Sequence, residues 1–320
     1  DLHSFPTRRS SDLEIIMILN GQNFRILSWD ATASKFKVIA MATNCVVTLN
    51  NNTEESSTKD DVGLASMPQV ISKAWSVSVD SLAVGNVLVF LDDIKNFKKF
   101  KLVWDETSTA DNMTGQHATF GRVGDAILND ATFTFDDRAS SAKSLQFSGV
   151  SPLTALDDEP YAIQSEDVGL YTKGQFVRLF LSSDATSTPS AVIAASRTLS
   201  LHLSVTMEDS TTKDTEGIWT SQVPTGISYD ISSSALVRGN DTITSSVDAQ
   251  DLAGVEGIFD TGAAVKWQIA NVSGANQRTK GSIIASGKAI ITQLQITAQN
   301  RQAATYQTTL NGYGALAVGA

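Results

Sequence analysis

The stretch TLSLHLSV, from Thr198 to Val205, decides the fold class because polar and apolar residues alternate along it. In an extended chain, successive side chains point to opposite sides, so every second residue shares a face. The apolar face carries Leu199, Leu201, Leu203 and Val205. The polar face carries Ser200, His202 and Ser204. This alternation predicts a β-strand that buries one side and leaves the other polar.

Strand signals of the same kind dominate the rest of the chain, as short alternating runs separated by Gly, Asn, Asp and Ser. The clearest runs are Asn44 to Leu49, Trp75 to Asp80, Ala126 to Phe135, Lys143 to Phe147, Tyr229 to Ser234, Ala289 to Ala298 and Tyr306 to Leu310. Helical spacing of apolar residues predicts one helix between Ser81 and Ile94 and another from Asp248 to Phe259. We therefore expect a mainly β protein of two tandem β-sandwich or barrel domains, each with one helix packed on the sheets.

The second half of the chain repeats the first. Glu54 to Asp60 (EESSTKD) returns as Glu208 to Asp214 (EDSTTKD) at an offset of 154 residues. Further along the offset becomes 163, which aligns Gly124 with Gly287, Arg138 with Arg301 and Gly149 with Gly312. The change of nine residues falls between Leu236 and Lys266, as expected for an insertion in a loop. Two copies of one fold explain this pattern better than a short-period solenoid.

The domain boundaries follow from the repeat. Residues 1–16 are set apart, because Ser4 to Leu13 (SFPTRRSSDL) resembles the translation of a sequencing-adapter oligonucleotide, and we expect the reading frame to start at Met17. The alternative, a basic arm or signal sequence, lacks an apolar stretch and a small-residue cleavage site. We expect a first domain at 17–153, a linker at 154–174 and a second domain at 175–320.

Composition and motifs exclude several classes of protein. The chain has 24 Lys and Arg against 34 Asp and Glu, a net charge of −10, which disfavours tight binding of duplex phosphates. The only cysteine, Cys45, allows neither an internal disulfide nor a Cys-based zinc site. No apolar run approaches the length of a bilayer span, so we expect no membrane contact. No nucleophile elbow, Walker loop or dinucleotide motif occurs, and we expect neither an enzyme nor a cofactor or metal.

The titratable residues give no catalytic pattern either. His202 lies on the polar face of its strand, and no second His or Cys at metal-ligand spacing accompanies it, so a surface or interface role is expected. Adjacent carboxylates such as Asp136 and Asp137 point apart on a strand and rarely converge on one ion.

The chain resembles a known family in several ordered motifs. The Lys213-Asp214 segment leading to Gly217-Ile218-Trp219, and the ending from Ile296 through Tyr306 to the stretch Asn311-Gly312-Tyr313-Gly314-Ala315-Leu316, are similar to the major tail (tail tube) proteins of long-tailed bacteriophages. The first half matches less well, since it has Leu64-Ala65 in place of the tryptophan and ends in Gly149-Val150-Ser151-Pro152-Leu153. Together the two copies cover nearly all of the chain after Met17.

The resemblance implies a structural virion protein of the phage tail, assembled in the bacterial host cytoplasm. In that family one domain per subunit forms stacked hexameric rings whose inner sheets join into one barrel. A two-domain chain would then close as a trimer with pseudo-sixfold symmetry. If each domain lends four strands, the barrel has a backbone diameter of about 48 Å, enough for duplex DNA of about 20 Å to pass without tight binding. The implied partners are further copies of the chain, DNA, and the tape-measure, tail terminator and baseplate proteins.

Two long polar segments, Asn50 to Pro68 and Thr206 to Pro224, separate neighbouring strands of the two halves and are expected to be hairpin loops. In the family this loop reaches the next ring. We hypothesise that opposite charges, such as Lys213 with Glu208, set the register between rings; similarity through recent duplication alone is the alternative. The candidate contact residues are Glu54, Glu55, Thr58, Lys59, Asp60, Gly63, Glu208, Asp209, Thr212, Lys213, Asp214, Gly217 and Trp219.

Other functions stay open from the sequence. The inner tube of a contractile injection device would have similar subunits. A tandem immunoglobulin-like or adhesin module that binds surfaces predicts a monomer without lateral sheet contacts. An enzyme would need a concave site with converging titratable groups.

Overall fold

The computed structural model describes residues 24–30, 35–39, 42–56, 68–82, 93–97, 99–106, 122–155, 173–212, 218–237, 249–250, 252–273 and 279–319. The expected segment 1–16, most of the linker and most of the first expected helix lie outside these residues. Among the described segments, no helix combines the length and the apolar character that crossing a bilayer requires.

Every strand of the described chain belongs to one 16-stranded sheet. The strands of the first half are β1 (Phe24–Asp30), β2 (Lys35–Val38), β3 (Ala42–Glu55), β4 (Pro68–Leu82), β5 (Lys99–Glu106), β6 (Arg122–Asp136), β7 (Ala142–Gly149) and β8 (Thr154–Ala155). The second half comprises η2 (Gly174–Phe176), β9 (Val177–Leu181), β10 (Ala191–Ile193), β11 (Ser196–Asp209), β12 (Gln222–Leu236), β13 (Ala249–Gln250), α2 (Leu252–Thr261), β14 (Val265–Ser273), β15 (Thr279–Thr297) and β16 (Thr305–Val318). The pairings are antiparallel except that of β10 with β13. The expectation of a mainly β fold is confirmed.

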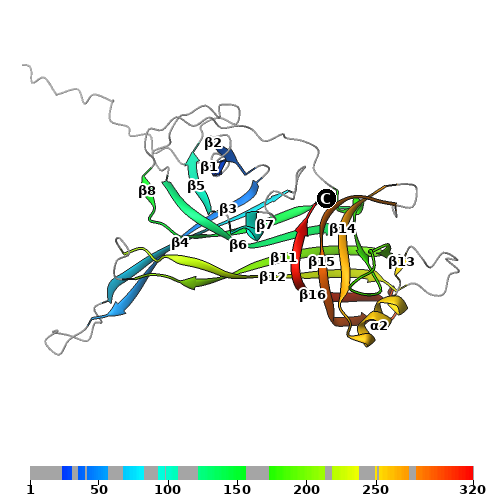
Figure 1. Cartoon of the computed structure of the whole chain (residues 1–320). Coiled ribbons are helices and arrows are strands. Elements are labelled where there is room, and N and C mark those ends of the chain that lie inside the picture. Colours follow the sequence, from blue (N-terminus) through cyan, green and yellow to red (C-terminus); the bar gives the residue numbers. More distant parts are fainter. Residues whose placement is uncertain are drawn as a thin grey trace, which may run out of the picture.

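Eight strands, among them the longest of the chain that the structure describes, form a continuous part of this sheet that we call the inner sheet. Its order is β3-β4-β7-β6-β11-β12-β16-β15, so four strands of the first half lie beside four of the second. β6 and β15 are long enough to leave the inner sheet and pair with β5 and β14 respectively. The strands outside the inner sheet thereby form a lobe over each half. Figure 1 shows these two lobes joined by the long strands β6, β11 and β12.

Two pairs of strands begin and end at the offset of 154 residues found in the sequence. β3 and β11 differ by 154 residues at both ends, as do β4 and β12. At the offset of 163, Arg138 and Arg301 both adopt the left-handed backbone conformation, with φ of 65° and 63°. Few residues other than Gly, Asn and Asp do so, and equivalent turns therefore leave β6 and β15.

The core lies on the apolar face of the inner sheet, as the alternation predicts. Leu199, Leu201 and Leu203 are at most 1% exposed, and large side chains such as Phe133 and Trp267 are fully buried beside them. Removing each of these side chains from water contributes roughly 1.5–3 kcal/mol to the free energy of unfolding. The same core extends under both halves without a break.

Two glycines make room for an aromatic ring at equivalent places in the core. A Cβ at Gly149 would lie 2.2 Å from the Trp75 ring, and one at Gly312 would lie 2.5 Å from the Tyr229 ring. Both rings anchor their polar atom on a nearby carbonyl: Trp75 Nε1 donates to the oxygen of Ser151 at 2.8 Å, and the Tyr229 hydroxyl donates to that of Lys288 at 2.7 Å. The repeated glycines are therefore required by packing.

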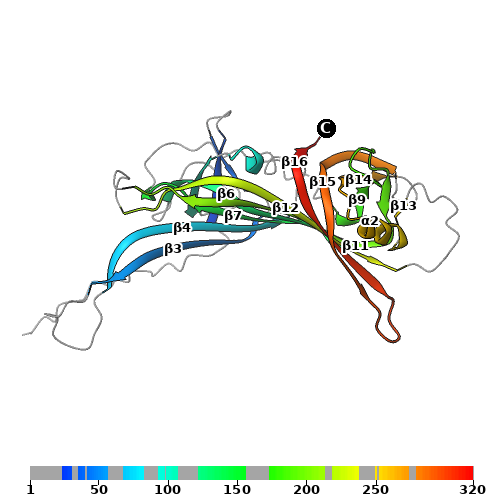
Figure 2. The same cartoon turned by 60° about the horizontal axis from the view of Figure 1, so that its bottom comes forward.

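The structure corrects the expected hairpin loops. Residues 50–55 continue strand β3, and residues 206–209 continue β11, so these parts of the polar segments are strand. The sequence does not alternate there because residues 48–55 are exposed on both sides of a ribbon that extends beyond the core. β15 likewise begins ten residues before the expected Ala289. Figure 2 shows the β3–β4 and β15–β16 hairpins projecting from opposite ends of the molecule.

Candidate assembly interface

The two halves meet along β6 and β11, which we call the intrachain seam. The two strands pair antiparallel over seven positions, from Thr198 opposite Asp136 to Ser204 opposite Asp130. On the core side of the seam, the opposed pairs are Phe135 with Leu199, Phe133 with Leu201 and Ala131 with Leu203. All six are at most 3% exposed. The seam is thus a complete lateral sheet contact with its own buried apolar face.

A charged cluster lies on the polar side of the same seam. His202 of β11 stands between two carboxylates: its Nε2 is 2.7 Å from Asp130 Oδ2 on β6, and its Nδ1 is 2.8 Å from Asp230 Oδ1 on β12. The side chains are 36%, 33% and 42% exposed, respectively. Burial lowers the pKa of His202, but hydrogen bonds and charge from Asp130 and Asp230 outweigh it, so the pKa is raised overall. We call this the Asp130–His202–Asp230 cluster.

The strands equivalent to the two seam strands are open edges. β3, the equivalent of β11, pairs with β4 and with no other described strand. Residues 290–297 of β15, the equivalent of the seam part of β6, pair on one side only, with β16. Large apolar side chains are exposed on both edges: Leu49 on β3 is 63% exposed and Ile296 on β15 is 52% exposed. An open edge with exposed apolar side chains is a template for adding another strand.

The polar face of the inner sheet is built from hydroxyl, amide and carboxylate side chains. Where the strands from β4 to β16 are paired on both sides, the ionisable residues on this face are Asp80, Asp130, Asp230 and His202. No Lys or Arg occupies these doubly paired stretches of the face. The opposite face is covered by the core, so this face is the side of the sheet that stays in water.

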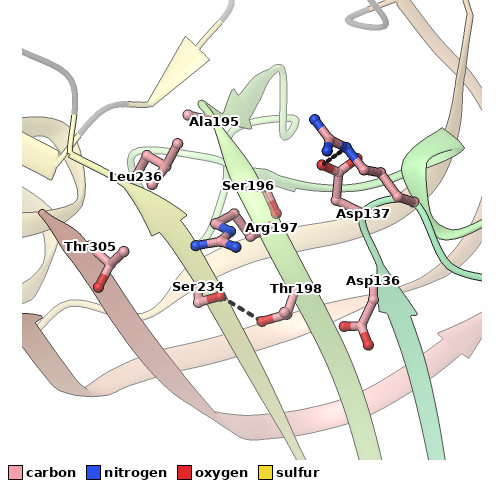
Figure 3. A pocket seen from close by; sticks show the side chains of 10 residues that line it. Asp136, Asp137, Ala195, Ser196, Arg197, Thr198, Ser234, Leu236 and Thr305 are labelled. Carbon is pink, nitrogen blue, oxygen red and sulfur yellow. Dashed lines mark hydrogen bonds and ion pairs between the residues drawn. The ribbon is translucent and has the colours of Figure 1, made fainter. Parts of the chain in front are cut away.

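A shallow pocket marks one end of the intrachain seam (Figure 3). Its lining includes Asp136, Asp137, Arg138 and Arg197, which come from both halves of the chain. Arg138 Nε lies 3.7 Å from Asp137 Oδ2, and both side chains are exposed to solvent. No nucleophile with an adjacent base lines the pocket, and no group of three or more His, Cys, Asp or Glu among the described residues is arranged to hold a metal.

The expected contact residues fall into three groups. Glu54 and Glu55 lie at the exposed end of β3, and Glu208 and Asp209 at the end of β11, with Thr212 just beyond it. Thr58, Lys59, Asp60, Gly63, Lys213, Asp214 and Gly217 lie outside the described residues.

Trp219 forms the third group, in a contact that the sequence did not suggest. The amide of Lys73 on β4 donates to the carbonyl of Ile218 at 2.6 Å, and that of Thr220 donates to the carbonyl of Lys73 at 2.9 Å. The Lys73 ammonium lies 6.0 Å from the centre of the Trp219 ring. These contacts tie the tip of the β11–β12 hairpin to the β3–β4 hairpin of the same chain.

The second half of the chain is similar to a known protein family. A sequence model described as phage tail tube protein matches residues 176–318. The tail of an empty gene transfer agent particle, determined with C6 symmetry, is similar at 20% identity over 44% of this chain and 96% of that chain, with a TM-score of 0.33. The virion of a native gene transfer agent particle is similar at 18% identity over 47% of this chain and 99% of that chain, with a TM-score of 0.33. The SPP1 tail tube is similar at 14% identity over 46% of this chain and 78% of that chain, with a TM-score of 0.31. No curated protein matches the chain.

Proposed function

Because residues 176–318 belong to the phage tail tube protein family, we infer that the chain is a structural subunit of a phage tail tube that assembles as a trimeric ring. The observation that carries the ring is the intrachain seam together with the two open edges that are its equivalents. The protein acts in the tail of the virion, and its role is structural.

We propose that the first half is a second tail tube domain. The coinciding bounds of β3 with β11 and of β4 with β12 support this, as do the paired left-handed arginines and the paired glycine-aromatic contacts. The domains span residues 17–153 and 175–320, with residues 154–174 as the connection. Each domain then contributes four strands to the inner sheet.

The intrachain seam supplies the register for the contact between chains. Thr134 of β6 lies opposite Ser200 of β11. Carrying these positions to the equivalent strands places Thr297 of one chain opposite Val46 of the next. The same register sets Ile296 against Val47 on the core side, and Leu294 against the exposed Leu49. The contact between chains would thus bury apolar side chains where the intrachain seam buries Phe133 and Leu201.

Three chains close this arrangement into a barrel of 24 strands. Its backbone diameter is about 48 Å, from a strand spacing of about 4.8 Å and a tilt of about 40°. The polar face of the inner sheet lines the lumen, because the apolar face packs under the outer lobes. A lumen with Asp80, Asp130 and Asp230 and few cations lets DNA pass, since fixed cations would hold its phosphates. The remaining proposed partners are the tape-measure, tail terminator and baseplate proteins.

Disulfide trapping tests the ring. In a Cys45→Ser background, the pair Val46→Cys and Thr297→Cys should oxidise to covalent dimers and trimers, with no larger closed species, on a non-reducing gel. The pair Val46→Cys and Ile296→Cys is the matched control, because its second side chain lies one position away and on the opposite face. Electron microscopy of the trapped sample should show rings.

Two results would reject the proposal: equal crosslinking by both pairs, or a chain that stays monomeric at high concentration. A monomer would favour the surface-binding alternative. Rings that stack inside a contractile sheath would point to an injection device with the same subunit geometry.

A further inference from the structure

The Asp130–His202–Asp230 cluster occurs at one kind of seam only. At equivalent positions, Asp130 corresponds to Gln293, His202 to Thr48 and Asp230 to Ser76. The proposed contact between chains would bring these three neutral side chains together on its polar side. The two kinds of seam therefore share an apolar core side and differ in charge.

Duplication creates a choice of partners for each strand edge. β6 and β15 are equivalent, and so are β3 and β11, so β11 fits β15 of another chain as well as β6 of its own. Pairing of that second kind gives domain-swapped chains. The apolar sides discriminate poorly, since Phe133 with Leu201 and Ile296 with Val47 are all apolar pairs and such cores tolerate exchange of similar side chains.

The polar side distinguishes β6 of the same chain from β15 of another chain as the partner of β11, because the cluster needs strands from both halves of the chain. In a swapped pairing Gln293 would take the place of Asp130 beside His202, and Asp130 would face Thr48. His202 would lose one of its two carboxylates, and Asp130 would lose its contact with the His202 ring. Charge complementarity of this kind selects partners more than it adds affinity.

The geometry also fixes the protonation state in which the cluster is complete. Both ring nitrogens of His202 face carboxylate oxygens, and these only accept hydrogen bonds, so both are satisfied only when the ring carries two protons. Asp130 from β6 and Asp230 from β12 are the ionisable groups facing the ring from the strands beside it, where Thr132 and Asp230 lie opposite His202.

We propose that the Asp130–His202–Asp230 cluster selects β6 of the same chain as the partner of β11, and thereby keeps the two halves of one subunit together during ring assembly. The proposal rests on the proposed function only for its consequence in the ring. The choice between β6 and another chain's β15 can be measured on the refolding chain itself.

Refolding with a disulfide reporter tests the proposal. In the Cys45→Ser chain, Thr134→Cys and Ser200→Cys lie opposite each other across the intrachain seam. A third change, Thr297→Cys, supplies a cysteine at the position of β15 that is equivalent to Thr134. After refolding from urea and oxidation, native pairing joins the cysteines at 134 and 200 and traps a monomer, whereas pairing of β11 with β15 of another chain joins those at 200 and 297 and traps covalent multimers. Adding His202→Gln should raise the multimer fraction about fivefold at high protein concentration and pH 6, as for loss of a partly exposed charge-assisted contact. Raising the pH to 9 should produce the same rise in the parent chain and little further change in the variant.

Asp80→Asn is the matched control. Asp80 lies on the same polar face but away from the seam, accepting hydrogen bonds from Ser144 and Asn44. Its replacement should leave the multimer fraction at the parent value. An unchanged fraction in His202→Gln, or an equal rise in Asp80→Asn, would overturn the proposal.

If His202→Gln refolds poorly, a second variant tests the proposal by placing a copy of the cluster at the contact between chains. The triple change Thr48→His, Ser76→Asp and Gln293→Asp keeps the native cluster and gives the second seam an equal one, so the multimer fraction should rise. No rise would count against the proposal. The reporter is independent of ring formation, so a chain whose Val46 and Thr297 positions fail to crosslink rejects the ring while leaving this result readable.

Discussion

Replacing Gly149 by alanine tests how tightly the Trp75 ring fits the first half of the core. The added methyl would lie 2.2 Å from Cε2 and 2.3 Å from Nε1 of the ring. Contacts between such atoms normally begin above about 3.4 Å, so the ring must move by about 1 Å. That movement breaks the 2.8 Å hydrogen bond from Nε1 to the carbonyl of Ser151.

The expected cost follows from these two effects. Overpacking of a filled core costs about 1–3 kcal/mol. An indole N–H left without its partner adds about 1 kcal/mol. Gly149→Ala should therefore lower the free energy of unfolding by about 3 kcal/mol. Gly226→Ala is the control, because a Cβ at Gly226 meets nothing within 4 Å, and it should change stability by no more than about 1 kcal/mol, in the stabilising direction.

Urea denaturation followed by circular dichroism measures both variants. The clash is assigned to the ring by adding Trp75→Ala, which removes it. Gly149→Ala should cost little in the Trp75→Ala background, which corresponds to a coupling energy of about 3 kcal/mol between two residues in contact. Additive costs, or equal costs for Gly149→Ala and Gly226→Ala, would refute the packing argument.

Three further predictions concern an edge strand, a turn and the cysteine. Leu49→Ala should change the stability of the isolated chain by less than about 0.5 kcal/mol because the side chain is 63% exposed, yet reduce ring yield in sedimentation severalfold. Asp184 accepts hydrogen bonds from the hydroxyls of Ser187 and Thr186, and then from their amides, and these lower its pKa. The stabilisation is present above the unfolded pKa of about 3.9 and is lost as the pH falls toward the folded value, so Asp184→Asn should flatten the pH dependence of the thermal midpoint below pH 4. Burial, then the charge of Asp80, raises the pKa of Cys45, so a thiol reagent at pH 7 should react at least about tenfold faster with the urea-unfolded protein.

The sequence predicts the elements that alternate over the core. TLSLHLSV forms the central part of β11 with its leucines buried, and the alternating run in β4 buries Trp75, Val77 and Val79. In a half-buried strand every second residue is apolar, so the local sequence indicates both the strand and the face that it buries. The ends of β3 and β11 could not be predicted in the same way, because both faces of these ribbons are in water and their sequence carries no period.

The charged cluster shows why the site was only partly predictable. The polar position of His202 on its strand is local information and was expected, together with a surface or interface role. Its carboxylate partners are 72 and 28 residues away, and they meet it only through the register of β6 and β12 against β11. Neither register can be predicted from the sequence around Asp130. The contact of Lys73 with the segment from Ile218 to Thr220 was missed for the same reason, since Thr220 and Lys73 are 147 residues apart in the sequence.

The β6–β11 ladder has a kinetic consequence. Its strands belong to one polypeptide, so they meet at an effective concentration set by the connecting chain, and dilution cannot separate them. In a ring of three such chains, half of the contacts between neighbouring domains would form within single chains, before any two molecules meet. Only three bodies would then lose their freedom to tumble and diffuse independently, where six single-domain subunits would each have to do so.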